Sequence, residues 1–486
     1  MIPLLGFTPD APTTTQGIIL DCSNWIPYEA GMCAAPSAQA YSDALAKECR
    51  GAEALTLLDA SRRLFAGTDA ALYELSGTSW TDRSRGGGYT LGASTQWSFC
   101  QFGDTSIASN IDTTIQSSAS GAFADISGAP KAKIVESVLS SGGGFVFGFN
   151  TIDGTYGTSP DRWWCCGVND VTSWTPSVTT QATTGRLLGA EGAITCAAKL
   201  GADQVVAYKD NSLYVGNFVG PPLVWAWTEF PGFGAAGMNS VANLGTAHFC
   251  VGRDDIFIFD GARPQPVADG KFRQWFNDNC SGTYRYKTEV LYDKAKDLVW
   301  IRFVSAGSAT GALDRCLVYH LKTGQCGRAQ ADAETTLLFT VPSATFDGDS
   351  GTFDSATDTF DANPPGARIV AYFDTSHVLR TLDGTPGASS FTLHDLGDNA
   401  IVTRLSRAGL QYMIKPDTAS LSAFYSMATG AGVNTGDSQS AYDVPSNGDN
   451  FFPLRQTARW HRLKFNFTGN CRVVAYDAPL QPAGVR

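Results

Sequence analysis

The sequence lacks the motifs from which common catalytic and metal sites are recognised, and it has only five histidines. No G-x-S-x-G nucleophile elbow and no phosphate-binding P-loop occurs in it, and its twelve cysteines form no C-x-x-C pair. None of the five histidines stands in a metal-ligand spacing such as H-E-x-x-H. We therefore expect no catalytic residue, no cofactor and no metal ligand, and a protein that is not an enzyme. The histidines, for which we predict structural roles, are His248, His320, His377, His394 and His461.

Long apolar runs are also missing. No segment approaches the roughly 20 apolar residues that a helix needs to cross a bilayer. The start, MIPLLGFTPD, lacks the basic residues that open a secretory signal, so we predict neither a signal peptide nor a membrane-spanning segment. The cysteines are then best explained as reduced, packed thiols of a protein that folds in a cytoplasm.

Positive charge is in deficit. The chain has 35 basic and 46 acidic residues, a formal net charge of −11. This balance argues against a protein that wraps duplex DNA through a basic stripe. It is compatible with nucleic acid that passes a weakly repelling surface without being held.

Short apolar runs that end in Gly, Asp or Asn are what the sequence has in abundance. Six such runs follow one another at intervals of 40 to 59 residues, and a four-stranded blade with its turns needs about 40 to 50. With 51 glycines and little helical periodicity, the chain is predicted to be mainly β, with a six-bladed β-propeller. The landmarks of the six runs are Phe65, Ile107, Phe147, Val206, Phe249 and Trp300.

The pattern divides the chain into four parts. We predict an N-terminal arm over 1–53, the propeller over 54–340, an acidic Gly/Ser/Asp linker over 341–368 and a β-sandwich-like subdomain over 369–486. The arm either grips a neighbouring molecule or supplies a strand that completes the last blade, and its segment YSDALAKECRGAEAL is expected to hold a short helix. The runs RIVAYFD and VLRTLD either belong to the subdomain or return to the propeller.

The linker carries acidic residues that invite comparison with calcium sites. Asp347, Asp349, Asp354 and Asp358 offer hard oxygen ligands, yet their spacing matches no complete EF-hand loop. We expect a solvated connector.

Aromatic and basic residues suggest further interpretations. The alternative function is that of a glycan- or receptor-binding propeller, in which tryptophan rings stack on sugars, although these rings are expected rather to lie in the core of the blades. A hydrolytic propeller is a weaker alternative, since GTSWTD at 77–82 matches only the end of a sialidase-type turn. Arg459, His461 and Arg462 alternate with apolar residues on an expected strand, where they face a partner, a lumen or solvent. The tryptophans concerned are Trp163, Trp164, Trp174, Trp225 and Trp227.

Several segments in order resemble one protein family. The arm GIILDCSNWIPYEAGMCAAPS, then KECRGAEAL with RRLFAGTDAALYEL, WSFCQFGDTSIASN, and VGPPLVWAWTEFPGFGAAGMNSVANLGTAHFCVGRDDIFIFDG are similar to the tail-tube nozzle, or tail hub, proteins of short-tailed bacteriophages. KFRQWF, LYDKAKDLVWIRF and the late ARWHRLKFNF extend this resemblance over most of 15–330 and into the C-terminal part.

The resemblance implies a structural protein of the virion tail. Such a protein forms a ring, commonly of six copies, below the portal and adaptor, where it retains packaged DNA and conducts it during ejection. Its expected partners are copies of itself, the adaptor, tail fibre or tip proteins, and double-stranded DNA in transit. Assembly would take place in the host cytoplasm.

Overall fold

The computed structural model describes all residues except 30, 331, 341–367, 430–441, 446–449 and 485–486. The chain is almost entirely β, and its one α-helix in the described part is the short α1 (Arg273–Asn279), followed by the 3-10 turn η1 (Arg285–Lys287). No described helix is long and apolar enough to span a membrane. The segment 41–55, predicted to hold a short helix, instead contains the end of strand β6 (Ser37–Ala44), a loop and the start of strand β7 (Ala52–Thr56), because strand pairing outweighs local helix propensity.

The described residues build seven four-stranded units rather than the predicted six. The first strands of these units lie against one another in sequence order, and the seventh lies against the first, so the units close a ring as propeller blades do. A single bridge between Thr114 and Lys131 joins the second and third units.

The strands of the seven units are, in order, β7 (Ala52–Thr56), β8 (Arg62–Gly67), β9 (Leu72–Ser76) and β10 (Ser79–Asp82); β11 (Ser98–Phe102), β12 (Thr105–Asn110), β13 (Thr113–Ser118) and β14 (Ala124–Asp125); β15 (Lys131–Ser140), β16 (Gly143–Asp153), β17 (Gly157–Cys165) and β18 (Thr183–Arg186); β19 (Cys196–Leu200), β20 (Gln204–Tyr208), β21 (Ser212–Gly220) and β22 (Val224–Pro231); β23 (Val241–Asn243), β24 (His248–Val251), β25 (Ile256–Phe259) and β26 (Pro264–Pro266); β27 (Glu289–Asp293), β28 (Leu298–Phe303), β29 (Arg315–His320) and β30 (Cys326–Ala329); and β31 (Thr335–Thr340), β32 (Arg368–Phe373), β33 (Val378–Gly384) and β6.

The six landmark residues of the sequence pattern all fall on the second strand of a unit, from Phe65 on β8 to Trp300 on β28. The sequence pattern did not predict the seventh unit, because β31 and β32 lie on either side of the predicted linker and the outer strand of this unit comes from the arm. The alternative that RIVAYFD and VLRTLD return to the propeller is the arrangement in the structure. The linker and its four aspartates lie outside the described residues, apart from Arg368.

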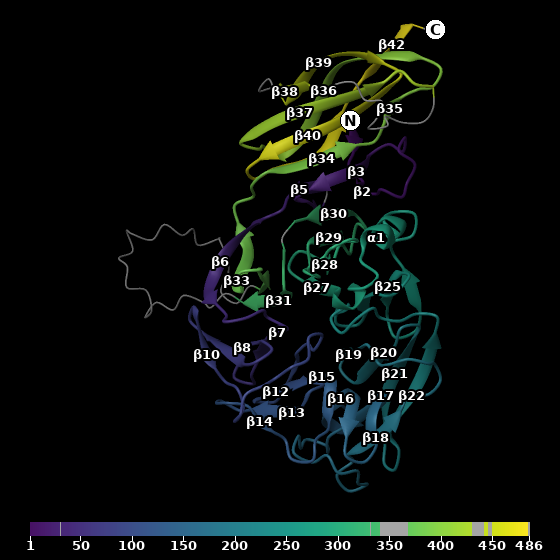
Figure 1. Cartoon of the computed structure of the whole chain (residues 1–486). Coiled ribbons are helices and arrows are strands. Elements are labelled where there is room, and N and C mark those ends of the chain that lie inside the picture. The colour runs from purple at the N-terminus through teal and green to yellow at the C-terminus, as the bar shows by residue number, and fades with distance from the viewer. Residues whose placement is uncertain (30, 331, 341–367, 430–441, 446–449, 485–486) are drawn as a thin grey trace.

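Both ends of the chain build a second β body beside the ring (Figure 1). One sheet of this sandwich has the order β2-β3-β34-β40-β37-β38 with β35 on β40, and the other contains β5-β41-β36-β39 with β1 and β42 at its sides. The strands are β1 (Ile2–Pro3), β2 (Gly6–Phe7), β3 (Ile18–Ser23), β4 (Trp25–Tyr28), β5 (Gly31–Ala34), β34 (Ser389–Leu393), β35 (Leu396–Gly397), β36 (Val402–Ile414), β37 (Thr418–Ser426), β38 (Tyr442–Pro445), β39 (Phe451–Ala458), β40 (Trp460–Thr468), β41 (Arg472–Asp477) and β42 (Leu480–Gly484).

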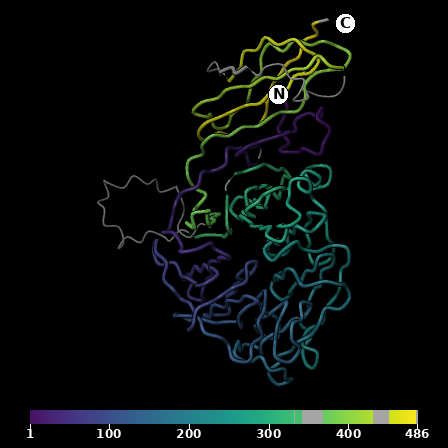
Figure 2. The backbone as a smooth tube through the Cα atoms, viewed as in Figure 1, coloured from purple at the N-terminus to yellow at the C-terminus, as the bar shows by residue number. Residues whose placement is uncertain are grey.

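The sandwich and the ring share a sheet and a core. Strand β4 pairs with β30 of the sixth unit through Trp25 and Arg328, so one sheet runs from the ring into the sandwich. Trp25 is fully buried and stacks on Phe467 with ring centroids 5.3 Å apart, in an apolar cluster that also holds Phe249 and Phe303 of the ring. The N-terminal segment therefore links the two bodies, as the colours along the tube in Figure 2 also show.

The arm completes the ring at the seventh unit. Strand β6 pairs antiparallel with β33, so the last blade takes its outer strand from the start of the chain. This arrangement matches the alternative in which the arm completes the last blade, and it ties the two ends of the propeller together.

Candidate functional site

The first strands of the seven units surround a central channel with a cavity of about 500 Å³. Its lining is more polar than apolar, although most residues on these strands are apolar. The polar groups include Glu53 on β7, Gln101 on β11, Glu136 on β15, Lys199 on β19 and Asn243 on β23. We take this channel as the candidate site because it gathers charged groups from several blades in one confined volume.

Glu136 is held in place by backbone groups of two neighbouring blades. Its Oε2 accepts a hydrogen bond from the Lys199 N–H at 3.2 Å, and its Oε1 accepts one from the Ser137 N–H at 2.9 Å. Burial raises the pKa of Glu136, and the charge of Lys199 opposes that rise. The carboxylate therefore bridges β15 to β19 in a fixed orientation.

Glu53 is open to the lumen, but the inner strands enclose that lumen, so the side chain faces a confined volume rather than bulk water. This confinement raises the pKa of Glu53 to about 8, with a smaller contribution from the nearby Glu136 charge and an opposing one from Lys199. A carboxyl whose pKa is raised in this way is able to carry a proton near neutral pH and to donate a hydrogen bond.

Glu289 at the start of β27 has a different role. It is almost fully buried, and burial raises its pKa. Its oxygens accept hydrogen bonds from Thr335 Oγ1 at 2.9 Å, from the Thr336 N–H at 2.6 Å and hydroxyl at 2.7 Å, and from Asn239 Nδ2 at 3.2 Å. These four bonds join three successive blades and occupy the carboxylate, so Glu289 is a structural tie.

The channel groups suit the binding of a small polar molecule. Together they offer the carboxyl of Glu53, the oriented carboxylate of Glu136 and the ammonium group of Lys199 to hydroxyl or amine groups, whereas the Gln101 and Asn243 carboxamides already hydrogen-bond protein groups. In the described part of the chain, no three His, Cys, Asp or Glu side chains come together as a metal site.

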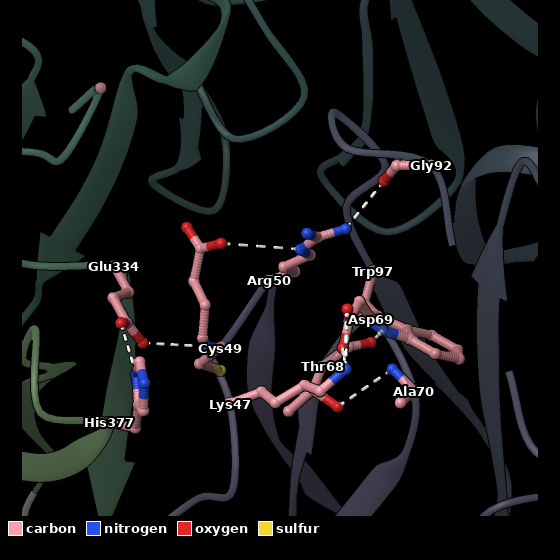
Figure 3. Close-up of polar contacts among 12 residues, drawn as sticks. Lys47, Cys49, Arg50, Thr68, Asp69, Ala70, Gly92, Trp97, Glu334 and His377 are labelled. Atoms are coloured by element: carbon pink, nitrogen blue, oxygen red, sulfur yellow. Dashed lines mark hydrogen bonds and ion pairs between the residues drawn. The ribbon is translucent and has the colours of Figure 1, made fainter. Parts of the chain in front are cut away.

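A second polar cluster fastens the arm where the ring closes (Figure 3). Glu334 accepts a hydrogen bond from the backbone N–H of Cys49 on one oxygen and contacts His377 Nδ1 at 2.6 Å with the other. Lys47 forms an ion pair with Asp69 of the first blade at 3.0 Å. The loop that leads into the first blade is therefore fixed to both the seventh and the first unit.

The tryptophans considered for sugar stacking lie in the blade core, as the sequence favoured. Trp163, Trp164, Trp174 and Trp225 are at most 7% exposed, and Trp227 packs against Phe147 and Trp163. The four buried rings are not presented to a ligand, and Trp227 is partly buried.

The five histidines are hydrogen-bonded to protein groups. His248 contacts the Tyr208 hydroxyl, His320 Thr323, His377 Glu334, His394 the Tyr476 hydroxyl, and His461 both Thr403 and Gln456. All twelve cysteines are unpaired and eleven are buried, which confirms the prediction of packed thiols.

The basic set expected on one strand face is divided by the structure. His461 is buried inside the sandwich, while Arg462 forms a two-bonded ion pair with the buried Asp395. Arg459 donates to the Asn399 carbonyl oxygen. These residues serve the sandwich itself, since strict alternation places His461 beside the inward-facing Leu463.

Sequence reasoning missed the channel groups, although a signal was present. Glu53, Lys199 and Glu289 are each a charged residue in a five-residue first strand of a blade, and Glu136 stands among the apolar residues of the longer first strand β15. A charge on an inner strand of a blade costs free energy of folding unless it faces a polar lumen or is paired.

Comparisons with known proteins give structures but no family. No protein-family model and no curated protein matches the chain. BBS1N in complex with ARL6DN has a TM-score of 0.39 at 9% identity and covers 72% of this chain and 96% of its own. YCF48 bound to D1 peptide has a TM-score of 0.37 at 11% identity, covering 79% and 97%.

Two further similar structures are glycoside hydrolases. The exo-beta-1,3-galactanase from Phanerochaete chrysosporium with galactose has a TM-score of 0.29 at 9% identity, covering 91% of this chain and 100% of its own. A second glycoside hydrolase has a TM-score of 0.24. The chain was expected not to be an enzyme, and against that expectation these two neighbours are enzymes. Because all four TM-scores are below 0.5, the likeness assigns no substrate or reaction, and none of the four is described as a phage tail protein.

Proposed function

We propose that this chain is a ring-forming subunit of a bacteriophage tail, placed below the portal and adaptor, where six copies surround the path of DNA. The proposal begins from the resemblance of its sequence segments to tail nozzle proteins. The structural observation that carries it is the rigid union of two bodies in one subunit.

That union rests on covalent order and packing together. The arm enters the sandwich, passes through β4 and β5 to the sheet of the sixth blade, and then supplies β6 to the seventh. Trp25 and the apolar cluster around it leave little freedom for one body to rotate against the other. A subunit with two rigidly related bodies offers the two distinct surfaces that a head-to-tail ring requires.

The charge of the chain supports a conduit. A net charge of −11 weakens contacts with DNA phosphates, so a duplex moving past the ring is not trapped. The acidic residues outnumber the basic ones in the chain as a whole, but not in every part of it.

The test uses purified particles of the virus that encodes this chain. Mass spectrometry of the particles should detect the chain in several copies, and electron microscopy should place a ring of it below the portal. Absence of the chain from the particles contradicts the proposal. Recombinant chain mixed with the adaptor provides an independent check, since it should convert from monomer to ring.

A second candidate function is that of a glycan- or receptor-binding module. The specific observation in its favour is the polar channel with Glu53, Glu136 and Lys199. Hydroxyl-rich ligands bind through such convergent polar groups. A glycan array and ligand-detected NMR test it: binding that Glu136→Gln weakens at least tenfold supports the candidate, and no binding by the wild-type chain removes it.

A further inference from the structure

Basic residues collect in the sandwich of this acidic chain. The four long strands β36, β37, β39 and β40 carry five Lys or Arg residues and no Asp or Glu, although acidic residues outnumber basic ones by 46 to 35 in the whole chain. Two of the five, Arg462 and Lys464, are on β40. The other three, Arg404, Arg407 and Arg455, lie on the neighbouring strands β36 and β39, and we call them the arginine face.

The arginine face is on one side of its sheet. On β39 the burial alternates, so Pro453, Arg455 and Thr457 are exposed while the residues between them are buried. Arg404 pairs directly with Thr457, and Arg407 pairs directly with Pro453. Since direct cross-strand partners point to the same side of a sheet, all three arginines lie on the outer face.

A backbone irregularity makes this possible. Residues three apart on a regular strand point to opposite faces, which would turn Arg404 or Arg407 into the core. The register of β36 against β39 shifts between Leu405 and Arg407, and this shift brings both arginines to the surface. Leu405 and Ala408 remain fully buried.

Two of the three arginines line a hollow on the surface, and described acidic groups compensate the face only weakly. Arg404 and Arg455 line the hollow with Ser406 and Pro453. Neither forms an ion pair with a described residue. Arg407 lies 4.9 Å from the Phe451 ring centroid and 3.8 Å from a carboxylate oxygen of the half-exposed Asp477, which is a weak contact.

We propose that the arginine face contacts the phosphates of duplex DNA. The inference rests on the proposed tail function and names the surface that meets the DNA. Guanidinium groups bind phosphate oxygens through two parallel hydrogen bonds, and Arg404 and Arg407 are about 10 Å apart along the strand, given a rise of about 3.3 Å per residue. Three such contacts per subunit are weak and exchange readily, as a moving duplex requires. Figure 1 shows β36 and β39 at the end of the molecule away from the propeller.

The experiment measures binding of a fluorescent 30-base-pair duplex of mixed sequence to the full chain by anisotropy over a salt series. The slope of log K against log salt should be about −2.7, because each phosphate contact contributes about −0.9. The variant R404Q/R407Q/R455Q should bind at least about tenfold more weakly and lose most of that slope. The control R253Q/R263Q/K294Q removes the same charge from exposed positions on the propeller and should bind like wild type.

The DNA-binding affinities of the wild type, the arginine variant and the control decide whether the arginine face contacts DNA. Equal binding by wild type and the arginine variant overturns the inference, and so does an equal loss in the control. Loss of adaptor capture with unchanged DNA binding also overturns it and assigns the face to an acidic protein partner. If the chain forms its ring in particles but DNA binding ignores the arginines, only this inference fails. If the arginines govern DNA binding but the chain is absent from particles, the tail function fails and the DNA contact stands.

Discussion

Glu334 accepts a hydrogen bond from the backbone N–H of Cys49 at 2.8 Å, across 285 residues of sequence. Cys49 lies just before the first strand of the ring, and Glu334 just before the first strand of its last unit. This bond therefore spans the point at which the circle of blades closes. The other carboxylate oxygen of Glu334 contacts His377, which lies in the turn between β32 and β33.

We expect Glu334→Ala to loosen this closure. The change leaves the Cys49 N–H and the His377 ring without an acceptor, which costs about 1–3 kcal/mol in the free energy of unfolding. Urea unfolding followed by tryptophan fluorescence measures the loss, and limited proteolysis should cut sooner near residues 45–51. Glu48→Ala is the control, because Glu48 is half exposed and its ion pair with Arg50, at 3.7 Å, is long and weak. Equal effects of the two changes would falsify the role of Glu334 in closure.

Gly67 and Trp97 are expected to set the fit between the first two blades. A Cβ atom added to Gly67 would come within 2.2 Å of the Trp97 ring, and Trp97 is anchored through its Nε1 to the Thr68 carbonyl oxygen at 2.9 Å. Gly67→Ala should therefore destabilise the fold by about 1–3 kcal/mol through overpacking. Gly86→Ala, where the added atom meets open space, should change stability little. A stable Gly67→Ala variant with unchanged near-UV circular dichroism contradicts this expectation.

Acid should destabilise the protein through its buried histidines. Burial lowers the pKa of both His248 and His461 to about 4, against about 6.5 in the unfolded chain. Between these values the unfolded state binds more protons, so stability is complete above pH 6.5 and falls as the pH drops toward 4, by about 3 kcal/mol for each histidine.

Urea unfolding of His461→Gln over this pH range should show a shallower fall in stability than wild type. Lys464→Gln, three residues further along the same strand, serves as the control, because it introduces the same side chain and leaves the histidine in place. Parallel curves for wild type and His461→Gln contradict the assignment of the titration to His461.

The two channel carboxyls should respond to each other. Removing the charge of its neighbour by Glu136→Gln should lower the pKa of Glu53 from about 8, yet leave it above its ordinary value because confinement persists. Carbon-detected NMR titration of glutamate carboxyls reports the change. Glu229→Gln, on β22 at the outside of the fourth unit, should leave the Glu53 titration where it is. An unaltered Glu53 pKa in the Glu136 variant rules out the coupling.

The propeller-like pattern followed from local sequence, but the number of units did not. Phe65, Ile107, Phe147, Val206, Phe249 and Trp300 repeat because each second strand is buried between neighbouring sheets, and that burial selects apolar residues locally. The seventh unit depends on pairing β33 with a strand more than 330 residues earlier, such as Arg380 with Ala40. No local pattern encodes a partner at that distance.

The candidate surfaces depend on tertiary structure still more strongly. Glu53, Glu136 and Lys199 are far apart in sequence and meet because radial packing brings the first strand of every blade to one axis. Arg404 and Arg407 share a face because of a register shift, and the local sequence around Ser406 does not predict that shift. The sequence by itself determined that the chain is β-rich, acidic and divided into repeated short strands, since strand propensity, charge and turn residues are local properties. Which strands pair, how many units close the ring and which charges come together were decided by long-range packing, where burial of each apolar face selects one partner among many.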